Sequence, residues 1–456
     1  KRGMKINALS KVFEEDRSID PEITIGDISL THVRYTTPIE QATPGMIIKI
    51  ESTDKDLIGI STLTDIYEFT LPPLVELLPV PLMKIAIEPL IPEKSPDMRK
   101  SIAKAQLCYP SLGVNIQGSE YTLVGTGEMF LDCVMHDIRN AFETIEIKVS
   151  DPFVVFNETI KSMSQMVCHA KINEECSIGV ICEKLNNQTI QELELSHLAR
   201  SKDLPKSLAK LGWDDINQNT VWCFGPDSKT GPNIFCVEQY PSYDDDEDEK
   251  STQFSPVVRK ILERSFVWAT GEGPLCDAMM RGVIVKIVDV NWKSKKMVSP
   301  GLIIPALRNA IFASFLCAEP HLMEPIYTFE IITPHNGEYF VEQVVTKRRG
   351  KVIAKYPLKG TTLRINIAEV PLIDSFGLEV DLRAKTQGQA FALSYFSKWE
   401  IVPGDPLDST IILRPLEPSV DEALAREFVV KTRRRKGQSE EVDISRYMNE
   451  NELIEL

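Results

Sequence analysis

The sequence predicts a multi-domain α+β protein in which one small βαββαβ arrangement occurs twice. Its 456 residues exceed what a single core organises, since domains usually span about 100–200 residues. Hydrophobic residues make up 43% and charged residues 26% of the chain, as in ordinary globular domains. The same order of strand-like and helical segments appears at residues 81–150 and again at 326–402. Together these observations predict about three or four domains.

Residues 1–75 alternate short β-like runs with turn residues. EITIGDISLTHVRY and GMIIKIES are rich in β-branched and other apolar residues, and the second follows the turn Thr43-Pro44-Gly45. Short strands separated by turns of this kind indicate part of a small β-barrel.

The first βαββαβ arrangement is predicted within residues 76–151. LMKIAIEPL indicates a strand, PDMRKSIAKAQLCYP a helix, GVNIQ and YTLVGTG a hairpin, and IEIKVS a final strand. The segment GEMFLDCVMHDIRNAF is the clearest helix, because its apolar residues recur at the spacing of one helical face. They are Leu131, Val134, Met135, Ile138 and Phe142. This order is typical of a ferredoxin-like module.

The second βαββαβ arrangement is predicted within residues 326–402. IYTFEIITP, KVIAKYPL, LRINIAEV and FALSYFSKWEIV indicate its strands. GEYFVEQVVTKRRG indicates a helix that carries Val341 and Val344 on one face and stops at Gly350. A second helix is expected to begin near Ser375, which is a suitable N-cap residue.

The segments outside these modules differ in character. Residues 152–325 are long and mixed, and they contain an acidic insert at 244–249. Six consecutive acids repel one another, so we interpret the insert as a solvated loop, with an acidic contact to a basic partner as the alternative. Residues 403–456 are acidic and helical in pattern, and KTRRRKGQ interrupts them.

Motifs for catalysis or metal binding are absent from the sequence. No G-x-x-x-x-G-K-[ST], N-K-x-D, H-E-x-x-H or G-x-S-x-G motif occurs, and none of the 9 cysteines forms a C-x-x-C pair. We therefore predict no catalytic, cofactor-binding or metal-ligating residue in this chain. Apolar runs such as GVIVKIV fall far short of the ~20 residues of a membrane span, so no membrane partner is expected.

Three basic groups are the candidate contact residues, because the net charge of −15 leaves only local patches for nucleic acid. The first is a predicted tip between a strand and a helix: Trp292, Lys293, Lys295, Lys296 and Met297. The second lies at a predicted helix end: Lys347, Arg348, Arg349 and Lys351. The third lies in the tail: Arg433, Arg434 and Arg435.

Each basic group has two interpretations. An exposed tryptophan on a basic hairpin suits stacking or a protein pocket, and arginine binds phosphate oxygens well. Alternatively, the tip is a solvated turn, and cations at a helix C-terminus satisfy the last carbonyl groups. The residues alone leave both interpretations open.

Longer motifs carry a family resemblance. WCFGPDSKTGPN, WATGEGPLCDAMMRGV, GLIIPALRNAIFASFLCAEPHLMEPIY, SFGLEVDLRAKTQGQAF and WEIVPGDPLD resemble eukaryotic elongation factor 2, in the order of that family and over nearly the whole chain. The resemblance implies the family's second to fifth domains, the fourth being a ribosomal-protein-like α/β domain. These domains correspond to residues 1–75, 76–151, 152–325 and 326–402, with 403–456 returning to the fourth domain.

The family's GTP-binding domain has no counterpart in these residues. We therefore expect the chain to be the C-terminal half of a longer GTPase, with GTP and Mg bound in a preceding domain and no cofactor in this segment. The chain begins KRGMKINALS, without an initiator Met, which agrees with this expectation.

One branch of the family is the nearer match. GTGEMFLDCVMHDIRNAFETIEIKVSDP looks like the spliceosomal branch, the GTPases of the U-five small nuclear ribonucleoprotein, and the acidic insert and divergent first hundred residues resemble a fungal version. The translocases of the family carry at the tip a His that is converted to diphthamide, and Met297 stands at that position here. This departure argues against a role in ribosomal translocation.

The resemblance to the spliceosomal branch implies nuclear work in pre-mRNA splicing, with GTP state coupled to remodelling of the spliceosome during activation and disassembly. The implied partners are the large spliceosomal scaffold protein, the spliceosomal RNA helicase that the branch regulates, and small nuclear RNA or pre-mRNA. The alternative is a ribosome-acting relative that works in translocation or large-subunit maturation. A self-contained enzyme is a third hypothesis, which GTP hydrolysis by this segment alone would support.

Overall fold

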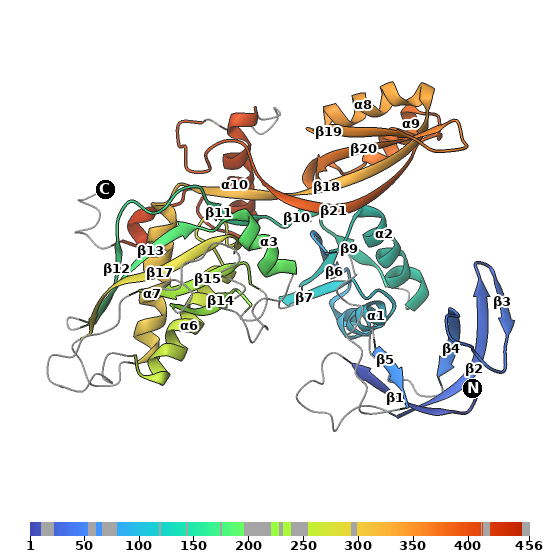
Figure 1. Ribbon diagram of the computed structural model, residues 1–456, viewed down its shortest axis with the longest axis horizontal. Helices are drawn as coiled ribbons and strands as arrows, with labels where there is room; N and C mark the ends of the chain where they lie inside the picture. The colour runs from blue at the N-terminus through green and yellow to red at the C-terminus, as the bar shows by residue number, and fades with distance from the viewer. Residues whose placement is uncertain are drawn as a thin grey trace. The chain divides into compact units, whose positions relative to one another are not determined.

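The chain folds into two compact units, each assembled from two segments (Figure 1). In the computed structural model, residues 1–154 join 327–397, and residues 155–326 join 398–456. The described residues are 1–10, 22–52, 61–65, 80–117, 120–142, 145–173, 176–195, 220–227, 231–238, 254–292, 299–411, 413 and 420–448. Within them, no helix combines the length and the apolar character of a membrane span. The acidic insert at 244–249 lies outside the described residues.

The first unit begins with a five-stranded antiparallel sheet. Its strands are β1 Lys5–Ser10, β2 Glu22–His32, β3 Tyr35–Pro38, β4 Ile48–Ser52 and β5 Ser61–Thr64. The long strand β2 pairs with β1, β3 and β4, and Ile6, Ile25 and Ile28 form a small core beneath it. This is the β-rich region that the alternating pattern predicted.

The next segment has the predicted βαββαβ order. Its elements are β6 Met83–Pro89, α1 Ser95–Cys108, β7 Gly113–Gln117, β8 Glu120–Gly125, α2 Glu128–Asp137 and β9 Ile147–Val149. Strand β6 is central and pairs antiparallel with β8 and β9, and β7 lies outside β8. The alternate residues Met83, Ile85 and Ile87 are buried, as are Leu131 and Val134 of α2. Strand β10, Phe153–Val154, also pairs with β6.

The second βαββαβ segment repeats this design. It consists of β18 Pro320–Pro334, α8 Glu338–Lys347, β19 Lys351–Pro357, β20 Leu363–Pro371, α9 Leu378–Lys385 and β21 Phe391–Ile401. The sheet order β21-β18-β20-β19 is that of a ferredoxin-like module. The predicted α+β fold class is therefore confirmed.

Two predicted helix ends in this segment need correction. Helix α8 stops at Lys347, and Arg349 rather than Gly350 adopts the left-handed conformation, with φ 55°. The N–H of Gly350 still donates to the carbonyl of Val345 at 2.9 Å, which closes the helix end. Helix α9 is capped by Gly377 at φ 71°, because Ser375 uses its hydroxyl on the carbonyl of Leu372 instead.

The second unit is built on a five-stranded sheet of order β12-β13-β17-β15-β14. These strands are β12 Cys168–Asn173, β13 Cys176–Lys184, β14 Val221–Gly225, β15 Asn233–Val237 and β17 Val283–Trp292. Helices α6 Pro256–Gly271 and α7 Pro300–Leu316 pack together beside it (Figure 1). Helix α3, Asn187–Leu195, covers the other face through Ile190 and Leu193.

The same unit includes the last α-helix of the described residues. Helix α10, Leu424–Arg435, buries Leu424, Phe428 and Val429. The ring of Phe428 stacks on that of Phe156 with centroids 5.4 Å apart. Phe156 precedes β11, Asn157–Ile160, which pairs with the first residues of β18 and with β16, Met279–Met280. The tail is thus part of this unit's core.

Candidate functional site

The predicted contact tip joins the end of β17 to the start of α7. Its residues Lys293, Lys295, Lys296 and Met297 lie outside the described residues. Trp292 is described, and its side chain is buried, with 6% of its surface exposed. The expectation of an exposed tryptophan is therefore wrong, because the indole is the last inward-facing residue of the strand.

The indole of Trp292 is held by a chain of aromatic contacts. It meets the ring of Phe254 edge-on at 5.9 Å, and Phe254 meets Trp222 edge-on at 5.7 Å. Trp222 in turn contacts Phe235, which stacks on Phe266 of α6 at 5.0 Å. Edge-on and offset stacked rings attract beyond their buried area. Trp292 therefore anchors one base of the tip to the core of the second unit.

The second basic group folds back on its own module. The guanidinium of Arg348 donates to the carbonyls of Asp374 at 2.7 Å and Phe376 at 2.6 Å, and to the carboxylate of Asp381 at 2.5 Å. This hydrogen bond from Arg348 holds the pKa of Asp381 below its ordinary value. Arg349 donates to the carboxylate of Asp374 at 2.6 Å. Both arginines thus fasten α8 to the turn before α9.

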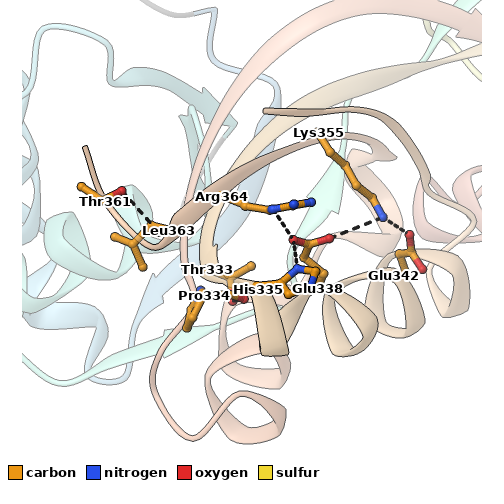
Figure 2. A network of polar contacts seen from close by, with 9 residues as sticks. All are labelled: Thr333, Pro334, His335, Glu338, Glu342, Lys355, Thr361, Leu363 and Arg364. Atoms are coloured by element: carbon orange, nitrogen blue, oxygen red, sulfur yellow. Dashed lines mark hydrogen bonds and ion pairs between the residues drawn. The ribbon is translucent and has the colours of Figure 1, made fainter. Parts of the chain in front are cut away.

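Lys347 and Lys351 remain exposed beside this contact. They are the members of the group whose charges stay available at the surface. A further lysine of the same edge strand, Lys355, is engaged with α8 instead (Figure 2).

Figure 2 shows how α8 binds the strands beside it. The carboxylate of Glu338 lies 3.0 Å from Nδ1 of His335 and 3.1 Å from Nε of Arg364, while Lys355 pairs with Glu342. The hydrogen bond from His335, with the nearby positive charges, holds the pKa of Glu338 below its ordinary value. These pairs neutralise Arg364 and Lys355 beside the start of α8, whereas Lys347 and Lys351 at the other end of the helix stay exposed.

The third basic group divides into inner and outer residues. Arg433 is buried, and its guanidinium donates to the carbonyls of Leu275 at 2.6 Å and Ser439 at 2.5 Å. Arg434 is exposed and pairs with Glu440 at 2.7 Å, and Arg435 is also exposed. The interpretation of Arg433 as a contact residue is therefore corrected: its charge holds the loop after α6 in place.

Glu158 is a buried polar residue that sequence reasoning missed. Its carboxylate accepts hydrogen bonds from the backbone N–H groups of Leu275 and Cys276 at 2.9 Å and of Ala278 at 3.0 Å. Burial raises its pKa to about 7, against the three N–H donors, which favour the charged form. The only sequence signal is one acid within the mostly apolar run FVVFNETI.

The loop Glu272–Ala278 is consequently clamped from two sides. Glu158 holds its N–H groups, and Arg433 together with Lys436 holds its carbonyl groups, Lys436 donating to Cys276 at 2.7 Å. A side chain on Gly273 would place its Cβ 2.2 Å from Glu158, so the clamp requires glycine there. In the described ranges, no three His, Cys, Asp or Glu side chains gather as a metal site. The polar clusters described above fasten elements to one another.

Comparison with known families identifies two domains. Residues 199–319 match the model of elongation factor G, domain IV, and residues 321–410 match that of the elongation factor G C-terminus. The first match includes the sheet strands β14, β15 and β17 with α6 and α7, and the second includes the second βαββαβ segment. The resemblance on which the fold prediction rested is therefore shown.

Curated relatives are similar over all or most of the chain. The 110 kDa U5 small nuclear ribonucleoprotein component CLO of Arabidopsis thaliana is 38% identical over 100% of this chain. Pre-mRNA-splicing factor cwf10 of Schizosaccharomyces pombe is 33% identical over 100%, and pre-mRNA-splicing factor SNU114 of Saccharomyces cerevisiae is 30% identical over 91%. The chain spans 44–46% of the length of these three relatives.

Proposed function

Because this chain carries domain IV and the C-terminal domain of the elongation factor G family and is similar over its length to U5 components, we propose that it acts in pre-mRNA splicing. It would do so in the nucleus, as a constituent of the U5 small nuclear ribonucleoprotein. The observation that carries this proposal is the similarity, over 91–100% of this chain, to a U5 component of a plant and to splicing factors of two fungi.

In this proposal, the residues of this chain transmit movement between domains and dock on partner proteins. GTP and Mg would bind in a preceding GTP-binding domain, and the GTP state would bias the arrangement of the domains that follow. The division of the chain into two compact units supports this role, because each unit is held together by contacts between its own residues. Docking on the large scaffold protein and regulation of the RNA helicase are the outcomes we propose for that movement.

We assign the segments to the family's domains as follows. Residues 1–75 would be domain II, 76–151 domain III, 152–325 domain IV and 326–402 domain V, with 403–456 returning to domain IV. The packing of Phe428 against Phe156 supports the last assignment, since it joins the tail to the segment that opens domain IV.

Co-purification tests the splicing proposal against a ribosomal one. The intact protein, tagged at its genomic locus, is purified at moderate salt, and its bound RNA and proteins are identified by sequencing and mass spectrometry. We expect U5 small nuclear RNA, the scaffold protein and the helicase to be enriched over ribosomal RNA. Enrichment of ribosomal subunits without spliceosomal RNA would reject the proposal in favour of translocation or subunit maturation.

A further inference from the structure

One exposed face of α6 combines cations with an aromatic ring. Lys260, Arg264 and Trp268 follow one another at intervals of four residues, so they form a single stripe along the helix. All three side chains are exposed, and 44% of the Trp268 surface faces solvent. A tryptophan exposed to this extent on a helix that is otherwise well packed is unusual for a core residue.

The stripe forms one wall of a hollow of about 790 Å³. Across from α6, the hollow is lined by Cys223, Pro226 and Asp227 at the end of β14. Its size falls in the range of pockets for small molecules, about 300–1,000 Å³. The hollow therefore has room for one planar group beside the indole.

The positive charges of the stripe are open to a ligand. Of the acids that line the hollow, Glu263 pairs with Arg259 at 2.8 Å and Glu272 pairs with Arg308 at 2.8 Å. No described residue forms a hydrogen bond or ion pair with Lys260 or Arg264. Two cations on one side of the hollow are thus available for anionic groups.

The indole of Trp268 is held in a fixed orientation. The guanidinium of Arg308 lies 4.0 Å from the centroid of the Trp268 ring, and its bond to Glu272 holds it there. A cation over one face fixes the ring, and the exposed part of Trp268 lines the hollow.

We propose that this hollow binds a nucleotide of single-stranded RNA, with the base stacked on Trp268 and the adjoining phosphates paired with Lys260 and Arg264. Base–aromatic stacking beside a cationic track is the general means of holding single strands. The carboxylates of Asp227, Glu263 and Glu272 can accept hydrogen bonds from amino groups of bases. Cations without an ion-pair partner among the described residues, beside an exposed indole, match the alternation of phosphate and base along a single strand, so the surface favours RNA.

RNA binding by the purified intact protein tests the proposal. The probe is a fluorescein-labelled oligocytidylate of about 12 nucleotides, measured by anisotropy between about 50 and 200 mM salt. We expect Trp268→Ala to raise Kd about tenfold and Trp268→Phe to restore most of the affinity. Lys260→Glu with Arg264→Glu should lower the slope of log Kd against log salt by about 1.4, since each lost phosphate contact contributes about 0.7.

Controls separate this site from other effects. Tyr339→Ala removes an even more exposed aromatic ring, 65% against 44%, from the other unit and should leave Kd unchanged. The exposed pair Lys260 and Arg264 serves as the test if Trp268→Ala fails to fold, as thermal unfolding reports. Photo-crosslinks to the probe should map to the α6 peptide.

Unchanged RNA affinity in folded variants would overturn the proposal. So would variants that bind RNA normally but lose a co-purifying protein, because the face would then be a protein contact. Failure here is distinguishable from failure of the splicing proposal, since purified protein and oligonucleotide are measured without the spliceosome.

Discussion

Two neighbouring arginines of α10 lie in opposite environments. Arg433 is buried and donates to backbone carbonyls of the loop after α6, whereas Arg434 is exposed and pairs with one glutamate. A buried cation bound to carbonyls cannot be removed without leaving those carbonyls unpaired, while an exposed ion pair contributes little.

Alanine substitution should expose this difference at the residue scale. Arg433→Ala is expected to lower the free energy of unfolding by about 2–3 kcal/mol, whereas Arg434→Ala should leave it almost unchanged. Urea unfolding followed by tryptophan fluorescence measures both. Equal losses in the two variants would mean that the Arg433 contacts contribute no more than a surface pair.

Glu158 predicts a pH dependence of stability. Its pKa is raised from 4.5 to about 7 by burial, so the folded state binds a proton that the unfolded state releases. Its stabilising contribution is full below pH ~4.5, and about 3 kcal/mol of it is lost as the pH rises to ~7. Glu158→Gln should abolish this slope.

The measurement compares unfolding free energies of wild type and Glu158→Gln between pH ~5 and ~8. The variant also places an amide N–H₂ against backbone N–H donors, so it should be less stable at every pH. A pH profile parallel to that of the wild type would show that Glu158 titrates alike in both states.

At the scale of elements, the tip stands between two fixed ends. On one side of the tip, Trp292 is held by aromatic contacts. On the other side, α7 begins at Pro300 and is buried over much of its length. The residues themselves were assigned to a contact from the sequence, and that assignment stays a prediction.

Charge reversal tests the tip. Lys293→Glu, Lys295→Glu and Lys296→Glu together are expected to reduce association of the intact protein with the U5 particle about tenfold, because rim charges steer and hold partners. The readout is U5 small nuclear RNA recovered per tagged protein. The matched control reverses three other exposed lysines, Lys171, Lys359 and Lys385. Equal recovery of U5 small nuclear RNA from both triple variants would show that the tip is a solvated turn without a contact role.

Elements also couple the two βαββαβ segments of the first unit. The carboxylate of Glu128, the first residue of α2, accepts from the N–H of Gly377 at 2.8 Å, and the hydroxyl of Tyr327 donates to the carbonyl of Thr126 at 2.8 Å. Arg348 shapes the turn that presents Gly377 through the carbonyl of Phe376. Arg348, which the sequence alone presents as a surface cation, thus supports the contact between the two βαββαβ segments.

At the scale of the whole molecule, the chain passes from one unit to the other more than once. The second unit needs the tail, because Phe428 stacks on Phe156, and Met448 joins a cluster with Cys168 and Ala313. Its stability is therefore shared between segments that lie far apart in the sequence.

Truncation tests this arrangement. A protein that ends at residue 402 loses α10 and is expected to lose more than about 3 kcal/mol of the second unit's stability, since large buried side chains are removed. Hydrogen exchange should accelerate in α7 and β13 and stay unchanged in α8 and β20. The Arg434→Ala variant, which keeps α10 and its buried side chains, is the control and should exchange like the intact protein. Uniform exchange in all three would show that the tail does not support this unit.

The sequence by itself determined the elements and their order. The periodic apolar residues of α2, such as Leu131 and Val134, and the repeated βαββαβ order depend on local chain geometry, which a one-dimensional pattern records. The long motifs added the family. Local pattern does not fix the ends of helices, because whether Ser375 or Gly377 caps α9 depends on which acceptor the Ser375 hydroxyl meets.

Only the tertiary structure decided which polar and aromatic side chains are exposed at the surface and which are buried. Trp292 is inside because Phe254, from a distant segment, covers it, and Arg433 is inside because the carbonyl of Leu275 lies within its reach. The sequence of α6 does not indicate that Lys260, Arg264 and Trp268 form an exposed stripe, because its pattern is that of any amphipathic helix. Burial is a property of contacts between remote residues, so it follows from packing and not from local pattern.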